Sequence, residues 1–157
     1  MIEIKEIQNL KRLLQPQITK VIITSSQDGF LGVALRKEVF VNEHNELVLL
    51  EPTETSELSR NLTYSIWFEK ELKILVEESN ASGTITCATP QRAIISGHEF
   101  EKYYKKYSDK RDLAAVWIMK INSISAIGEE CDIMNEKTHY PGIRHLDKLR
   151  RIKVETV

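Results

Sequence analysis

The feature that most constrains this fold is a short unbroken apolar run, residues 47–50 (LVLL). Apolar residues without alternation are typical of a strand that is covered on both faces, whereas a strand with one face in water alternates. We therefore expect other elements to pack on each side of this strand. The polar sequence after it, residues 51–62 (EPTETSELSRNL), predicts a turn and then a helix from residue 54 to about residue 64.

The start of this helix has three hydroxyl side chains, Thr53, Thr55 and Ser56. The backbone N–H groups at a helix start have no intrahelical partner, so they can donate to a phosphate while the helix dipole favours its charge. A simpler interpretation is that Thr53 caps the helix and that Glu54 and Glu57 complement the dipole. Taken alone, the segment favours the cap, and only its place in the chain supports an anion site.

Length and charge exclude several classes of protein. The chain has 157 residues, enough for one domain with a single core over residues 1–157, and its formal net charge of −1 would not attract nucleic acid or an anionic membrane. No apolar run of about twenty residues is present and the first residues do not resemble a secretory leader, so we expect a cytoplasmic protein. The two cysteines lie far apart and outside any CxxC spacing, which predicts neither a disulfide framework nor a zinc site.

Hydrophobic periodicity divides the rest of the chain into strands and helices. A helical stripe covers residues 1–16, and a hairpin follows with Asp28 and Gly29 as its turn. Its second strand is predicted to run on through residues 39–41 and to turn into residues 47–50, which gives a three-stranded meander. Further strands are predicted at 66–68, 72–76, 84–89, 92–96 and 114–121, with Pro90 as a break or bulge and a weak extension to 127, and further helices at 98–107 and 143–152.

Four segments of the sequence together match the pattern of a known family. They are the hairpin around Asp28 and Gly29, LVLLEP feeding TETSELSRNL, QRAIISG followed by HEFEKYYKKY, and the closing strand AVWIMKI. Together they span roughly residues 18–127, most of the chain, and they resemble the FMN-binding split-barrel family of the pyridoxamine 5′-phosphate oxidase type, including its flavin-nucleotide-binding relatives. The resemblance implies a mainly β fold, a six-stranded antiparallel split β-barrel with helical crossovers, followed by a C-terminal extension at 128–157.

In that family the phosphate of FMN is held by hydroxyl and basic side chains at the start of this helix and on the preceding strands, in a cleft shared by a homodimer. Glu57 and Leu58 stand where many relatives have arginine or lysine, and a carboxylate beside a phosphate repels it. Arg36 and Lys37 interrupt an apolar strand, so they are equally well explained as a solvated bulge or edge. The cofactor-binding residues that the resemblance implies are Thr53, Thr55, Ser56 and Asn61, with Arg36, Lys37, Arg60 and Arg92 as candidate cations.

The function that the resemblance implies is FMN binding, with hydride or electron transfer between a donor such as a reduced nicotinamide and a small molecule. Two alternatives stay open: a split barrel that binds haem or another cofactor, and a flavin-binding or interaction module without activity. The sequence singles out no catalytic group and no metal motif. His139 and His145 are interpreted as surface loop residues, with a haem or metal role for one of them as the alternative. Trp67 and Trp117 are predicted to lie in the core, unless one covers a flavin ring.

Overall fold

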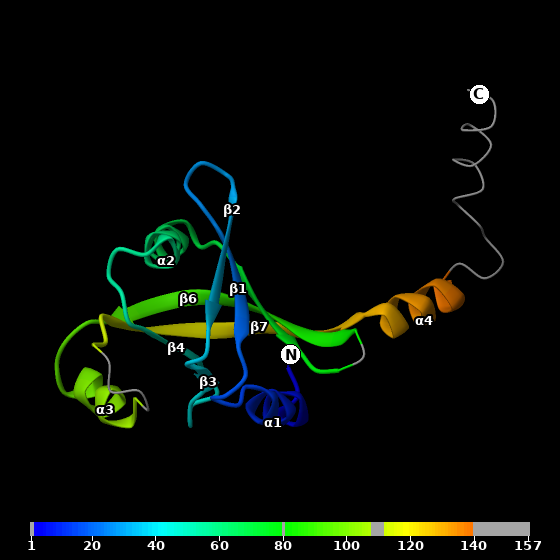
Figure 1. Ribbon diagram of the computed structural model, residues 1–157, viewed down its shortest axis with the longest axis horizontal. Helices are drawn as coiled ribbons and strands as arrows, with labels where there is room; N and C mark the ends of the chain where they lie inside the picture. Colours follow the sequence, from blue (N-terminus) through cyan, green and yellow to red (C-terminus); the bar gives the residue numbers. More distant parts are fainter. Residues whose placement is uncertain (1, 80, 108–111, 140–157) are drawn as a thin grey trace.

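Seven antiparallel strands form one sheet in the computed structural model, which describes residues 2–79, 81–107 and 112–139. Neighbours in the sheet follow the order β2-β1-β5-β6-β7-β4-β3, which matches the antiparallel part of the prediction. Figure 1 shows the long strands β6 and β7 with α2 on one side of them and α3 on the other. The strands are β1 (Lys20–Ser25), β2 (Leu31–Arg36), β3 (Val39–Val41), β4 (Leu47–Glu51), β5 (Leu72–Glu77), β6 (Ser82–Ile94) and β7 (Ala115–Gly128).

The predicted second strand of the hairpin is wrong in one respect, because it divides into β2 and β3 at Lys37 and Glu38. β2 pairs with β1 while β3 pairs with β4, so the two halves lie at opposite ends of the sheet order. The sheet therefore has seven strands, not the six that the resemblance implied. Of the eight strand segments predicted from periodicity, this division adds one, while residues 66–68 are helical and residues 84–89 and 92–96 form one strand. No pairing joins β2 to β3 within the described residues, so the sheet is not closed by hydrogen bonds there.

The helix after β4 was predicted about one turn too early. α2 runs over Glu57–Phe68, with Ser56 as its N-cap. Its C-cap is Glu69, which has a positive φ of 52°. The strand predicted at residues 66–68 is therefore wrong, because the aromatic and β-branched residues there form the last turn of the helix. Trp67 is exposed on that turn, which contradicts its predicted place in the core.

The second half of the sheet is longer and more continuous than predicted. β6 is a single strand, and Pro90 marks an irregularity in its register with β7 between Pro90 and Arg92 rather than a break between two strands. β7 extends to Gly128, so the weak pattern after Ile121 does continue the strand. The other helices are α1 (Ile4–Leu13), α3 (His98–Lys106) and α4 (Glu129–His139), and α4 was not predicted.

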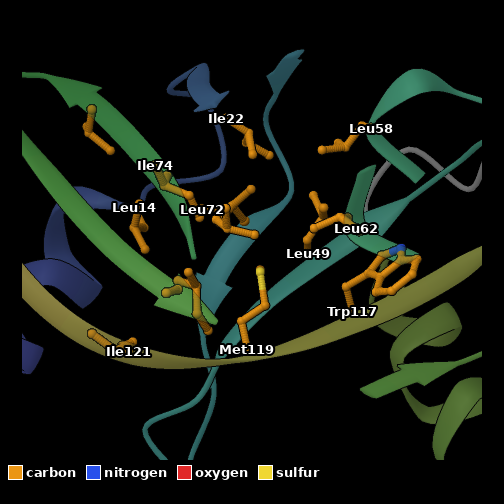
Figure 2. Close-up of a cluster of buried hydrophobic side chains, with 14 of the residues drawn as sticks. Leu14, Ile22, Leu49, Leu58, Leu62, Leu72, Ile74, Trp117, Met119 and Ile121 are labelled. Atoms are coloured by element: carbon orange, nitrogen blue, oxygen red, sulfur yellow. The ribbon is translucent and has the colours of Figure 1, made fainter. Parts of the chain in front are cut away.

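Two hydrophobic clusters lie on opposite faces of β4, as the unbroken apolar run predicted. Leu47 and Leu49 belong to the larger cluster, which α1 and α2 help to cover, whereas Val48 and Leu50 belong to a smaller one under α3. Figure 2 shows the larger cluster, with Trp117 beside Leu62 of α2. β4 is therefore buried over its whole length and places its last residue in the interior.

Some predictions fall on residues that the structure does not describe. These are the C-terminal helix at 143–152 and the haem or metal role of His145, both outside the described residues. Among the described helices, none has the length and apolar character needed to cross a membrane.

Candidate functional site

The start of α2 is organised by its own serines. The Ser56 hydroxyl accepts from Ser59 N at 3.0 Å and lies 3.1 Å from the Ser59 hydroxyl, which in turn donates to the carbonyl of Thr53 at 2.9 Å. Ser56 therefore caps the helix, and the prediction that Thr53 does so is wrong. These hydroxyls already have partners within the turn.

The carboxylate of Glu51, at the end of β4, lies beside this turn and is fully buried. It accepts two hydrogen bonds from the Arg36 guanidinium, from Nε at 2.9 Å and from Nη2 at 3.2 Å. It also accepts from the backbone N–H of Thr53 at 3.2 Å and from the Thr53 hydroxyl at 2.9 Å. One internal carboxylate thus takes up donors that the family resemblance assigned to a phosphate.

A cavity of about 310 Å³ lies between β2 and the start of α2, and we call it the β2 groove. Gly32 is required in its wall, because a Cβ there would lie 2.4 Å from the Asn61 Nδ2 atom and 2.9 Å from the Glu57 Oε1 atom. Asn61 is itself fixed, since its buried amide donates to the Thr24 hydroxyl at 3.0 Å. The β2 groove is lined by Thr24, Gly32, Val33, Ala34, Leu35, Arg36, Ser56, Glu57, Leu58 and Asn61.

A second cavity of about 460 Å³ shares Leu35 and Arg36 with the β2 groove. Lys37, Glu38 and Thr53 also line it. The two cavities therefore border the same arginine, whose guanidinium is bonded to Glu51.

The structure brings five of the eight predicted cofactor-binding residues to these two cavities. Among the other three, Thr55 and Arg60 are exposed side chains that line neither cavity. Arg92 lies on β6 and forms a bidentate ion pair with Glu99 of α3, both distances being 3.0 Å. The five residues brought together are Arg36, Ser56 and Asn61 at the β2 groove and Arg36, Lys37 and Thr53 at the second cavity.

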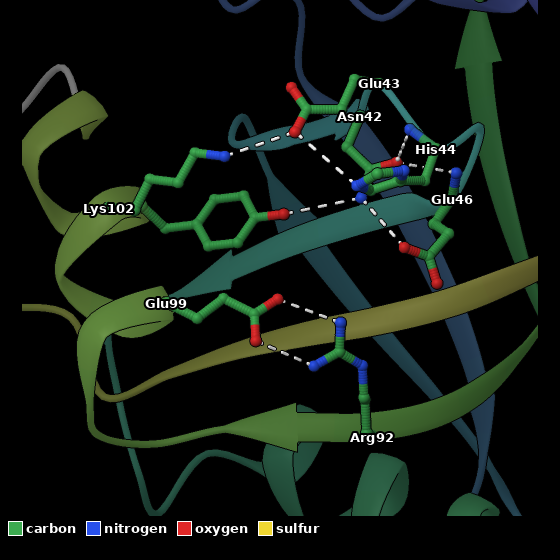
Figure 3. Close-up of polar contacts among 8 residues, drawn as sticks. Asn42, Glu43, His44, Glu46, Arg92, Glu99 and Lys102 are labelled. Carbon is green, nitrogen blue, oxygen red and sulfur yellow. Dashed lines mark hydrogen bonds and ion pairs between the residues drawn. The ribbon is translucent and has the colours of Figure 1, made fainter.

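The ion pair of Arg92 belongs to a polar cluster that joins α3 to the turn between β3 and β4 (Figure 3). The hydrogen bond from Arg92 lowers the pKa of Glu99, and the hydrogen bond from Lys102, at 3.3 Å, lowers the pKa of Glu43. The His44 Nε2 atom lies 3.7 Å from the Glu43 Oε1 atom. In the part of the chain that the structure describes, no three His, Cys, Asp or Glu side chains gather as metal ligands.

Two buried charged residues were missed by the sequence analysis. One is Glu51, and the other is Lys20, whose ammonium donates to the carbonyls of Gln15 and Lys37, both at 2.6 Å. Burial lowers the pKa of Lys20 to about 8, although the nearby Glu38 carboxylate acts in the opposite direction. The signal for Lys20 was available, because it shares the inward face of β1 with the alternating buried residues of that strand.

Trp117 is buried in the larger hydrophobic cluster, as predicted, and it does not line the β2 groove. Its indole Nε1 has no hydrogen-bond partner among the described residues. It lies on β7 opposite Leu49 of β4 and beside Leu62 of α2, so it is a core residue and not a surface residue (Figure 2).

The fold matches several solved structures, while no family model and no curated protein matches the sequence. HupZ of Group A Streptococcus is 16% identical with a TM-score of 0.63, and the match covers 82% of this chain and 96% of that one. An FMN-binding protein from Syntrophomonas wolfei is 9% identical with a TM-score of 0.60, covering 80% and 88%. HutZ, the haem storage protein from Vibrio cholerae, is 12% identical with a TM-score of 0.56, covering 75% and 92%.

These neighbours define the class of fold. The chain has the split-barrel fold shared by FMN-binding proteins of the pyridoxamine 5′-phosphate oxidase type and by HupZ and HutZ, and the resemblance seen in the sequence is confirmed at that level. Solved proteins of this fold carry flavins or haem in their names, so the fold alone does not select the cofactor.

Proposed function

We propose that this chain binds a flavin in the β2 groove. The observation that carries the proposal is the groove itself, which lies between a strand and a helix start in a fold shared with an FMN-binding protein. Its walls combine apolar residues such as Ala34 and Leu58 with the fixed polar pair of Asn61 and Thr24. Such a lining suits a flat ring with polar edges.

The two ends of FMN fit this site differently. The ring end meets apolar and amide groups in the β2 groove, whereas the phosphate end meets Arg36 and Thr53 already bonded to Glu51. A bound flavin would supply hydride or electron transfer between a reduced nicotinamide and a small acceptor. The protein's own part is to hold the ring and to exclude water, and the described residues single out no acid, base or nucleophile for it.

We propose that the working form is a homodimer. β2 is an edge strand whose outer face carries Leu31, Val33 and Leu35, which are 72%, 67% and 62% exposed. A contiguous apolar face on a sheet edge is a typical protein–protein contact, and a second copy of the chain would cover it next to the groove.

A titration of the purified protein with flavin tests the ligand. We expect a saturable change in flavin fluorescence, which Glu57→Trp should weaken because Glu57 lines the β2 groove opposite Gly32. Glu54→Trp is the matched control, since Glu54 is also an exposed carboxylate close to the start of α2 and lines neither cavity. Loss of binding in neither variant would place the flavin elsewhere, and the absence of any flavin binding would end the proposal.

Haem is the second candidate ligand, because HutZ shares the fold and because the donors of Arg36 and Thr53 are occupied by a carboxylate. A Soret band after addition of haemin, without a response to flavin, would favour haem.

The oligomeric state is tested separately by light scattering. Leu31→Lys should give a monomer, whereas Ile95→Lys, at another exposed apolar residue, should leave the mass unchanged.

A further inference from the structure

We infer that this site recognises a flavin by its ring alone and excludes the phosphate ester, so that riboflavin binds at least as tightly as FMN. The inference rests on the proposed flavin site and adds its ligand class, an uncharged flavin. Its basis is that hydrogen-bond donors between the end of β4 and the start of α2 are already bonded to other groups of the protein.

The first step is that the Glu51 carboxylate occupies the position beside Arg36 and Thr53 where the resemblance places a phosphate. Its carboxylate receives four hydrogen bonds, two from Arg36 and two from Thr53, between 2.9 and 3.2 Å. A carboxylate that is fully buried with a bidentate arginine is in the arrangement that makes such pairs strong. A phosphate at this position would have to displace Glu51 and leave its charge without a partner in the interior.

The second step is that the helix start offers no spare hydroxyl beside the groove. The hydroxyls of Ser56 and Ser59 are bonded to each other, and Ser59 also donates to the carbonyl of Thr53. The N–H of Ser59 is used by the Ser56 cap. The two serine hydroxyls and the Ser59 N–H are therefore engaged within the turn, and a phosphate would have to rely on the backbone N–H groups of Glu57 and Leu58, next to the Glu57 carboxylate.

The third step is the charge around the two cavities. The cavities are lined by two cations, Arg36 and Lys37, and by two carboxylates, those of Glu38 and Glu57. Behind them the buried Glu51 carboxylate holds Arg36, and the buried Lys20 ammonium lies near Glu38. Lys37 is exposed, and an exposed ammonium adds little binding energy in water. A dianionic phosphate therefore meets no net positive charge and has to compete with Glu51 for Arg36, while an uncharged ribityl chain needs no cation.

The decisive measurement compares riboflavin with FMN on the unaltered protein by calorimetry. We expect a Kd for riboflavin that is equal to or lower than that for FMN. An FMN Kd about tenfold below that of riboflavin would overturn the inference and leave the proposed flavin site standing. Binding of neither flavin would overturn both.

A variant sharpens the same comparison. Glu51→Gln keeps an acceptor oxygen for Arg36 and removes the charge, so FMN should bind about tenfold more tightly while riboflavin changes little. Glu54→Gln is the control, because Glu54 is an exposed carboxylate close in sequence that lines neither cavity. An equal gain for both flavins in Glu51→Gln, or an equal gain in FMN affinity in Glu54→Gln, would contradict a local effect of the Glu51 charge.

Discussion

Two arginine–glutamate pairs in this protein have nearly the same geometry and very different surroundings. Arg36 meets Glu51 at 2.9 Å with side-chain exposures of 24% and 0%, whereas Arg92 meets Glu99 at 3.0 Å with exposures of 49% and 47%. The first pair joins β2 to β4 beside the groove, and the second joins β6 to α3 at the surface. Both arginines were candidate phosphate ligands in the sequence, and both have a carboxylate as partner.

Because the two pairs have similar hydrogen-bond lengths but differ in burial, we expect their contributions to stability to differ. At the surface, water solvates either partner when the pair separates, so little free energy depends on the contact. In the interior, each charge relies on the other because water cannot replace it. Four predictions follow from this contrast, from the largest effect to the smallest.

Removing the buried carboxylate should have the largest effect. Glu51→Ala leaves the Arg36 guanidinium and two Thr53 donors without their acceptor, so the free energy of unfolding should fall by about 3 kcal/mol. Glu99→Ala should cost less than about 1 kcal/mol. Urea denaturation of both variants measures the contrast, and equal losses would mean that the interior pair is as well solvated as the surface one.

Lys20 extends the comparison to a buried cation held by backbone carbonyls. Burial lowers its pKa from 10.5 to about 8 in the native state, so between these values the unfolded chain binds more protons than the native one. Stability should therefore rise from pH 8 to pH 10.5 by something on the order of 1 kcal/mol. The rise should be absent in Lys20→Met, and a rise of the same size in that variant would assign it to other groups.

Salt should separate the two pairs by a smaller amount. The coupling free energy of Arg92 with Glu99, measured by a double-mutant cycle, should fall by about half between 0.05 and 0.5 M NaCl because mobile ions screen exposed charges. The coupling of Arg36 with Glu51 should change little, since ions do not reach a fully buried carboxylate. The same salt dependence for both cycles would contradict the difference in burial.

Acid should abolish the contribution of the Arg92–Glu99 pair to stability, which we expect to be a few tenths of a kcal/mol. The hydrogen bond from Arg92 lowers the pKa of Glu99 below its usual 4.5, so the contribution is complete above pH 4.5 and is lost as the pH falls through the lowered pKa. The difference in stability between the unaltered protein and Glu99→Gln should disappear over that range. A difference that persists well below it would show that the contact does not depend on the carboxylate charge.

The sequence predicted the parts of the fold that depend on local pattern. The unbroken run at residues 47–50 correctly required cover on both faces, and the two hydrophobic clusters supply it. The polar interruption at Lys37 was also a true signal, although it marks the division between two strands rather than a bulge. The last turn of α2 was missed because Ile66 packs on the core while its aromatic neighbours, which favour strands, point outward.

The candidate site was harder to predict, because its ion pair joins side chains from strands that are far apart in the sheet order. Nothing near Arg36 in the sequence indicates that Glu51 will meet it, since the two lie on strands that do not pair with each other. Arg92 looked equally suitable and lies beside α3 instead. Distinguishing the two required the three-dimensional positions of both carboxylates.

The bend between β2 and β3 has a mechanical consequence. Only Lys37 and Glu38 connect strands at opposite margins of the sheet, and their carbonyls accept from Lys20 Nζ and from Leu50 N, so the bend is anchored to β1 and to β4 at once. A protease cut at this bend would remove the covalent link between the two margins and break no ladder hydrogen bond, and it would leave the Arg36–Glu51 ion pair between β2 and β4. Cutting the turn at Gly29 would leave the margins covalently linked, so the two connecting residues limit how far β2 and β3 can separate at the bend.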